Sequence, residues 1–222
     1  MILYTLESIK EHSPKTKILY TGSTCIYPKE NPQPINESRF MAGPLEETNK
    51  GYAMAKGMGI VACELYRNQY GINAVEAMPT NMYGPKDNYN LQSSHFFAAT
   101  IIKMVKAKRE GAVPVFWGTG RPRREALYVE DCADALIYLM ENYNDSKIVN
   151  VGTGIDNTIS EYVDTVKRLV DYDGEIKWDV SKPDGMFQKM TDISYLKSIM
   201  PDYSPRTFEE GARHILKTEF GF

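Results

Sequence analysis

Hydrophobic and polar positions alternate along the chain with two periods, one typical of strands and one typical of helices. Short apolar runs predict strands at residues 17–21, 73–78, 113–117 and 148–151. Longer segments with helical spacing predict helices at residues 3–12, 51–68, 95–108 and 129–143. Strands that alternate with helices in this way favour a parallel sheet covered by helices on both faces.

Two further helix starts are marked by capping boxes, in which a glutamate follows a threonine by three residues. They begin at Thr158, with Glu161, and at Thr207, with Glu210. Prolines break the pattern elsewhere. A proline-rich stretch at residues 28–44 and the segment 79–85 therefore predict loops.

One element of a dinucleotide-binding fold is missing from the pattern. Such a fold begins with a strand and a Gly-x-x-Gly-x-x-Gly turn, whose backbone approaches a pyrophosphate at a helix N-terminus. The chain has no such turn, because Gly22, Gly152 and Gly154 all follow later strands. We therefore expect an α/β fold, a partial Rossmann fold (a doubly wound parallel sheet) lacking its first strands. A smaller C-terminal α+β domain for substrate should complete it.

Composition narrows the class of protein. The chain has 222 residues, 42% of them hydrophobic and 25% charged, which are ordinary globular values. A net charge of −3 and a pI near 5.7 argue against binding to nucleic acid or to anionic membranes. The cysteines at 25, 63 and 132 lack metal-ligand spacing, which favours a reducing cytoplasm and no metal. We see neither a membrane-length apolar run nor a signal peptide.

Three residues suggest hydride-transfer chemistry. Tyr52 and Lys56 are four residues apart on a predicted helix and so share one face. A phenol protonates an alkoxide poorly at neutral pH unless a nearby cation lowers its pKa, and a lysine one turn away supplies that cation. Ser23 follows the predicted strand 17–21, and its hydroxyl can hold a carbonyl that is being reduced. Tyr-x-x-x-Lys also occurs on many helices for solvation alone, so the strand before Ser23 is what favours catalysis.

From residue 2 almost to its end, the chain resembles the latter part of the GDP-L-fucose synthases, in the extended short-chain dehydrogenase/reductase superfamily. The resemblance depends on the Gly-Ser-Thr-Cys-Ile-Tyr-Pro motif at 22–28, the catalytic helix entry at 44–56 and the loop at 78–88. Ser94-His95, Trp117-Gly-Thr-Gly, Arg123-Arg-Glu and the segments 150–154 and 182–185 complete it. Tyr-x-x-x-Lys specifies the superfamily, whereas the Cys25 motif with Ser94-His95 is close to specific for the family.

The resemblance implies roles for individual residues. Ser23, Tyr52 and Lys56 match the reductase triad. Cys25 matches the base that epimerises the sugar, and His95 matches the acid. Inverting C3 and C5 beside a C4 ketone requires removing an acidic proton and returning one to the opposite face. A thiolate and an imidazole are suited to that task near neutral pH.

The resemblance also implies ligands and partners. The cofactor is expected to be NADP(H) and the substrate a GDP-sugar, with a homodimer formed partly through the Tyr52 helix. Expected cofactor-binding residues are Ser23, Tyr52, Lys56, Pro79, Asn81, Met82 and His95. Expected substrate-binding residues are Lys103, Trp117, Arg124 and Lys189. We expect residues 1–83 and 126–154 to form the coenzyme domain, and residues 84–125 and 155–222 the sugar-nucleotide domain.

Two departures from the family pattern leave alternatives open. Lys103 stands where the family usually has arginine, and residues 185–189 read Gly-Met-Phe-Gln-Lys instead of Gly-Thr-Pro-Arg-Lys. The substrate can therefore be a related GDP-4-keto sugar, such as a 6-deoxy-heptose. We interpret the chain as an N-terminally truncated member of this family. It can also be a non-catalytic fragment, or a subunit that pairs with a separate nucleotide-binding chain. Because the phosphate-binding turn is missing, we expect the chain alone to bind NADPH weakly or not at all.

Overall fold

The computed structural model describes residues 1–222 and divides them into two compact units. Unit 1 comprises Met1–Thr80, Cys132–Gly154 and Thr191–Ser204. Unit 2 comprises Asn81–Asp131, Ile155–Met190 and Pro205–Phe222.

This division differs from the sequence-based boundaries at three segments, residues 81–83, 126–131 and 191–204. Residues 126–131 belong to unit 2, because strand β5 (Arg123–Tyr128) pairs there with β3 (Asn81–Tyr83). Thr191–Ser204 belongs to unit 1, because Thr191 bridges to Ile35 and helix α6 (Ser194–Ile199) packs on β6 (Val149–Val151). Periodicity gave no sign of either contact, since both join segments far apart in the sequence.

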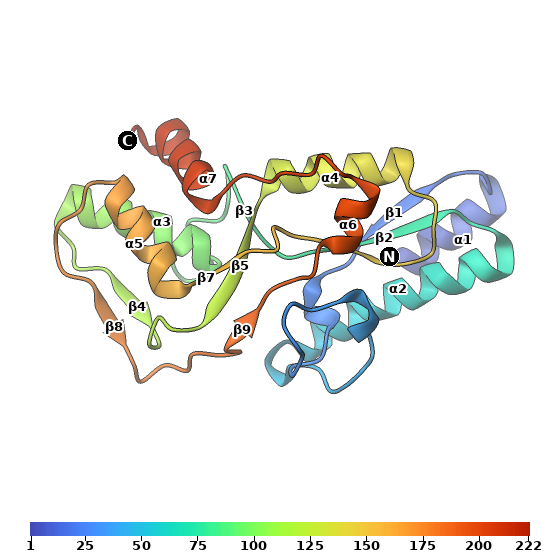
Figure 1. Ribbon diagram of the computed structural model, residues 1–222, viewed down its shortest axis with the longest axis horizontal. Coiled ribbons are helices and arrows are strands. Elements are labelled where there is room, and N and C mark those ends of the chain that lie inside the picture. Colours follow the sequence, from blue (N-terminus) through green and yellow to red (C-terminus); the bar gives the residue numbers. More distant parts are fainter. The chain divides into compact units, whose positions relative to one another are not determined.

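Unit 1 is built on a parallel sheet in the order β1-β2-β6, where β1 is Ile18–Thr21 and β2 is Ala74–Pro79. All six residues of β2 are buried, as expected for a strand with a neighbour on each side. Helix α2 (Lys50–Tyr70) connects β1 to β2, and helix α1 (Ile2–His12) packs against it (Figure 1). Gly71, in the left-handed conformation with φ 70°, ends α2.

Unit 2 is centred on β5, which pairs with three strands. β3 runs parallel to its second half, β7 (Asp156–Thr158) runs antiparallel to its first half, and β9 (Gln188–Lys189) runs parallel to that same half. A separate parallel pair joins β4 (Val115–Trp117) to β8 (Lys177–Asp179). The helices are α3 (Phe96–Glu110), α5 (Ile159–Leu169) and α7 (Phe208–Ile215), followed by a π-helical turn, Leu216–Phe220. Aromatic side chains dominate the core between them, among them Tyr83, Phe97, Tyr128, Tyr162 and Phe208.

Most strongly periodic segments were predicted in the right class. The structure confirms α1, α2, α3, β1, β2, β4 and β6, with bounds shifted by one or two residues. Helix α4 (Val129–Asn142) also forms where the pattern predicted it, and both capping boxes are present at Thr158 and Thr207. Strands β3, β5, β7, β8 and β9 and helix α6 were not predicted, and β3 forms inside a segment that was expected to be loop. No helix combines the length and the apolar character needed to cross a membrane.

Asn150, on β6, ties three loops of unit 1 to the sheet. Its Oδ1 accepts a hydrogen bond from the Tyr27 hydroxyl at 2.6 Å, and its Nδ2 donates to the carbonyls of Ile35 (2.9 Å) and Asp192 (3.2 Å). Its backbone N–H donates to Oε1 of Glu37 at 3.1 Å. Asn150 is fully buried, so the amide keeps its hydrogen bonds entirely within the protein. Tyr27 comes two residues after Cys25, and the loop carrying Cys25 is therefore fixed by this amide.

A second buried polar group, Glu76 on β2, is less well satisfied. Its side chain is 2% exposed, and Oε2 is buried without a hydrogen-bond partner. Burial raises the pKa of Glu76 to about 7, and the nearby Arg67 guanidinium opposes that rise. The folded state therefore holds the Glu76 proton more tightly than the unfolded chain does.

We predict that unit 1 loses stability as pH rises from about 4.5, the unperturbed pKa, to about 7. The shift corresponds to a loss on the order of 3 kcal/mol. Glu76→Gln should remove most of this slope while leaving the stability at low pH little changed. Hydrogen exchange of the β2 amides, measured across this pH range, reports the opening free energy directly. Glu141→Gln, at an exposed position of α4, is the matched control, and an unchanged slope in Glu76→Gln contradicts the assignment.

We also predict that Tyr27→Phe loosens the loop around Cys25. The change removes one hydroxyl and leaves the buried Asn150 Oδ1 without its donor, which costs about 1–3 kcal/mol. Alkylation of Cys25 by iodoacetamide, followed by mass spectrometry, should become several-fold faster, with the buried Cys63 and Cys132 as internal references. Tyr4→Phe, at a residue 83% exposed, should change nothing. Equal alkylation rates in wild type and Tyr27→Phe would show that Asn150 does not restrain the loop.

Candidate active site

Ser23 and Cys25 lie at the carboxyl end of β1, where the strand turns into a short 3₁₀ helix, Thr24–Ile26. Ser23 is the N-cap of this turn, and its Oγ accepts a hydrogen bond from the Cys25 N–H at 3.2 Å. Both side chains are partly exposed, whereas Thr24 and Ile26 between and beyond them are buried. The turn thus presents a hydroxyl and a thiol at the edge of a parallel sheet where ligands of open α/β sheets bind.

Lys56, on α2, reaches the same strand end. Its Nζ donates to the Thr21 carbonyl oxygen at 2.8 Å, two residues before Ser23. The same ammonium lies 5.9 Å from the centroid of the Tyr52 ring. Lys56 therefore links the strand end that carries Ser23 to the helix face that carries Tyr52. The Tyr52 side chain is 52% exposed, which leaves it accessible to a ligand.

Tyr20, on β1, contacts Lys56 through both its hydroxyl and its ring. Its hydroxyl donates to the Lys56 carbonyl at 3.2 Å, and its ring centroid lies 5.6 Å from the Lys56 Nζ. The ring crosses α2 at Gly59, where a Cβ would overlap it. A glycine inside a helix lowers its stability by about 1 kcal/mol relative to alanine. The helix is therefore weakened at Gly59, and the Tyr20 ring can in return approach closely enough to contact Lys56.

Unit 2 contains His95, which matched the acid of the family. His95 is exposed and is the N-cap residue of α3, but its side chain makes no capping hydrogen bond. The imidazole is thus not committed to the helix end. We expected Ser23, Cys25, Tyr52, Lys56 and His95 to act together, and the structure assigns the first four to unit 1 and His95 to unit 2.

The three residues expected at the cofactor loop differ in their surroundings. Pro79 is buried at the end of β2, in unit 1. Asn81 starts β3, in unit 2, and its Nδ2 donates to the Glu125 carbonyl at 3.2 Å. The side chain of Met82 is 44% exposed. Asn81 therefore stabilises the β3–β5 pairing with its amide nitrogen, while Met82 presents an apolar side chain to solvent.

The expected substrate residues Lys103 and Trp117 lie around strand β4. The Lys103 Nζ donates to the Val115 carbonyl at 2.7 Å and lies 4.9 Å from the Phe116 ring centroid. Burial lowers the pKa of Lys103. Trp117 is 70% exposed, and the Lys182 ammonium lies 5.6 Å from its ring. An exposed indole of this kind offers a flat apolar face to a planar ligand.

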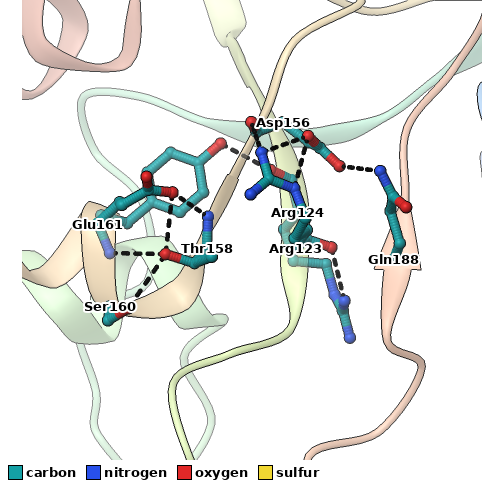
Figure 2. Close-up of polar contacts among 8 residues, drawn as sticks. Arg123, Arg124, Asp156, Thr158, Ser160, Glu161 and Gln188 are labelled. Carbon is teal, nitrogen blue, oxygen red and sulfur yellow. Dashed lines mark hydrogen bonds and ion pairs between the residues drawn. The ribbon is translucent and has the colours of Figure 1, made fainter.

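Arg124 and Lys189 are direct neighbours across two strands. They are register partners in the parallel pairing of β5 with β9. The Arg124 Nη1 donates to the Arg123 carbonyl at 2.8 Å (Figure 2). Burial lowers the pKa of Arg124, and the Asp184 carboxylate opposes that shift. A desolvated guanidinium next to a lysine forms a site suited to an anion with more than one charge.

Sequence reasoning gave no role to several polar residues that shape these surroundings. Asp184 accepts hydrogen bonds from the Thr119 N–H (2.6 Å) and from the Thr119 hydroxyl (2.8 Å), and these bonds lower its pKa. It thereby joins the loop after β8 to the turn after β4. Asn150 and Asp184 both lie within motifs that carried the family resemblance, which was the available signal. Asp156, which forms an ion pair with Arg123 at 2.8 Å, lies in no such motif and could not have been identified in that way.

The structure contains no group of three or more His, Cys, Asp or Glu side chains arranged to hold a metal ion. The polar groups described above are hydroxyls, a thiol, an imidazole and cations. They are groups that donate protons, accept protons or bind anions.

Comparison with known proteins agrees with the family resemblance. A probable GDP-L-fucose synthase of Oryza sativa is 48% identical over 184 residues, which are 82% of this chain and 56% of the relative. The chain thus spans less than two thirds of the length of this relative. A GDP-L-fucose synthetase from Naegleria fowleri, solved with NADP bound, superposes with a TM-score of 0.91 at 25% identity. That superposition covers 97% of this chain and 69% of the other.

A second solved structure is a GDP-mannoheptose C4 reductase from Campylobacter jejuni with NADP bound. It matches with a TM-score of 0.79 and 28% identity, over 90% of this chain and 67% of the other. Residues 1–152 match the model of the NAD dependent epimerase/dehydratase family, which is more than half of the chain. The chain therefore belongs to the NAD dependent epimerase/dehydratase family.

Proposed function

We propose that this chain carries the catalytic groups and the sugar-nucleotide-binding unit of a GDP-L-fucose synthase. The reaction is 3,5-epimerisation of GDP-4-keto-6-deoxy-D-mannose followed by NADPH-dependent reduction at C4. The observation that carries the proposal is the Ser23–Cys25 turn at the end of β1, with Lys56 bonded to the same strand end. The similarity to proteins named GDP-L-fucose synthase supports the substrate.

In the epimerisation, Cys25 acts as a thiolate and removes the proton at C3, and then the proton at C5. Both protons are acidic because they lie next to the C4 ketone. The resulting enolate carries its charge on O4, where the Ser23 and Tyr52 hydroxyls donate hydrogen bonds. His95 returns a proton to the opposite face of each carbon, a role assigned from the Ser94-His95 motif. The partly exposed thiol and the imidazole without a capping bond are suited to these transfers.

In the reduction, NADPH supplies the hydride that reaches C4. Tyr52 donates its hydroxyl proton to O4 as the alkoxide forms. Lys56 stabilises the phenolate that remains, because its ammonium is held beside the Tyr52 ring by the Thr21 carbonyl. The fit to a dinucleotide is supported by the position of these groups at the carboxyl ends of parallel strands. Pro79, Asn81, Met82 and His95 are the further residues that we propose to contact the cofactor.

We infer that unit 1 handles the coenzyme and that unit 2 binds the GDP moiety. Arg124 and Lys189 are proposed to bind the diphosphate, with Lys103 and Trp117 contacting the rest of the substrate.

A second candidate function is that of a 4-reductase for a GDP-heptose, which the similarity to the Campylobacter C4 reductase favours. Lys103 and residues 186–188 are the positions that we expect to discriminate between the two substrates. Turnover of a panel of GDP-4-keto sugars would distinguish the two functions. A third possibility, a non-catalytic fragment, predicts no turnover of any member.

The epimerase role is tested by proton exchange, which needs no coenzyme. In D₂O we expect the chain to incorporate deuterium at C3 and C5 of GDP-4-keto-6-deoxy-D-mannose, as followed by NMR. Cys25→Ser should slow both exchanges by about 10²-fold or more, because a hydroxyl is a far weaker base than a thiolate. His95→Asn should slow inversion similarly, whereas His12→Asn, at an exposed site, should have no effect. Exchange that survives in Cys25→Ser would exclude Cys25 as the base.

We also propose a homodimer formed through α1 and α2. Met54, Met58 and Leu65 are 51%, 62% and 49% exposed and follow helical spacing along α2, and Leu3 on the adjoining α1 is 51% exposed. A stripe of exposed apolar residues across two packed helices can be buried against the same pair of helices in a second copy of the chain.

Sedimentation of the wild type should give about twice the chain mass of 25.2 kDa. Met58→Glu should shift the protein to monomer and Met41→Glu, in an exposed loop, should not. A monomeric wild type rules the interface out.

A further inference from the structure

Asp156, at the start of β7, joins three strands of unit 2 through one carboxylate. Its Oδ1 accepts from the Arg123 Nε (3.0 Å) and Nη2 (2.8 Å), and its Oδ2 accepts from the Gln188 Nε2 at 2.8 Å. Arg123 belongs to β5 and Gln188 to β9. Figure 2 shows the carboxylate between the two side chains. We call Asp156, Arg123 and Gln188 the Asp156 clamp.

The hydrogen bonds of the Asp156 clamp fix the positions of its three side chains. The Asp156 side chain is 6% exposed, and its backbone carbonyl also accepts from the Arg123 Nη2, at 2.7 Å. A two-point contact from a planar guanidinium fixes both distance and orientation. The remaining carboxylate oxygen is used by Gln188, so a short two-residue strand is tied to the centre of the sheet by a side chain as well as by its backbone.

The clamp uses one face of the strands and leaves Arg124 and Lys189 on the other. Arg123 and Gln188 are register partners, as are Arg124 and Lys189. Successive side chains of a strand point to opposite faces, and paired residues share a face. Figure 2 accordingly shows the Arg124 guanidinium directed away from Asp156. The two adjacent arginines therefore have different tasks: Arg123 neutralises Asp156, whereas Arg124 is bonded to a backbone carbonyl.

We propose that the Asp156 clamp positions Lys189 beside Arg124 and so creates a two-cation subsite for a diphosphate. This inference rests on the proposed function, which supplies the diphosphate. Gln188 is the residue that determines the geometry, because its hydrogen bond sets the register of β9 against β5. Asp156, Arg123 and Gln188 are positioning residues and do not themselves touch the ligand.

The test uses the whole chain and two probes, GDP and GMP, titrated by calorimetry. Gln188→Met keeps the size of the side chain and removes the bond to Asp156. We expect it to weaken GDP binding about tenfold, the value of one charge-assisted contact, and to change GMP binding much less. The affinity for GDP should also become less sensitive to salt, since one cation no longer faces the ligand.

Two further variants separate positioning from a general structural effect. Gln188→Arg keeps a hydrogen-bond donor toward Asp156. Unlike Gln188→Met, it should bind GDP at least as tightly as the wild type does. Gln69→Met, the same change at an exposed position of α2, is the matched control and should leave both probes unaffected. If wild type binds GDP and Gln188→Met binds it with unchanged affinity and salt dependence, the clamp is overturned while the proposed function stands. If wild type fails to bind GDP, the proposed function and this inference are both overturned.

Discussion

A buried polar group is costly unless it is hydrogen-bonded, and each unit of this protein is organised around one buried polar residue whose hydrogen-bond partners are supplied by several segments. In unit 1 the residue is Asn150, whose amide holds three loops on β6. In unit 2 it is Asp156, whose carboxylate holds β5 and β9. Leaving either group with an unmatched partner costs about 1–3 kcal/mol, more for the charge. The loops of unit 1 and the short strand β9 of unit 2 have little regular structure of their own, and these hydrogen bonds fix their positions.

This constraint also explains where sequence reasoning succeeded and where it failed. Helix α2 was predicted because its apolar spacing, its length and its terminal Gly71 are all local signals. Strand β5 was missed because it begins Arg-Arg-Glu, which has the polarity of a loop. Arg123 is compatible with a strand interior only because Asp156, 33 residues later, neutralises it. No pattern within a short window contains that information.

The candidate site shows the same limit. Ser23, Tyr52 and Lys56 could be proposed from the sequence because their spacing along strand and helix is itself the signal. The Thr21 carbonyl and the Tyr20 hydroxyl that fix Lys56 were not found, because neither residue type is distinctive. Arg123 and Arg124 look alike in the sequence, yet Arg123 forms a partly buried ion pair with Asp156 and Arg124 does not share in it. Alternation of the strand decides which arginine faces Asp156, and the register of β9 can be known only from the folded sheet.

Lys56 illustrates what such supports contribute, although one of them weakens the local helix. An ammonium on a flexible side chain loses on the order of 2 kcal/mol of rotamer freedom when it is fixed. The Thr21 carbonyl and the Tyr20 ring constrain it, and the Tyr20 ring can lie across α2 only because residue 59 is glycine. That glycine makes the helix less stable by about 1 kcal/mol. An unconstrained lysine would distribute its charge over many rotamers, whereas this arrangement holds the charge beside Tyr52 before any ligand arrives. Helix stability is thus exchanged for a cation whose position is fixed in advance, which is the condition for electrostatic stabilisation without reorganisation.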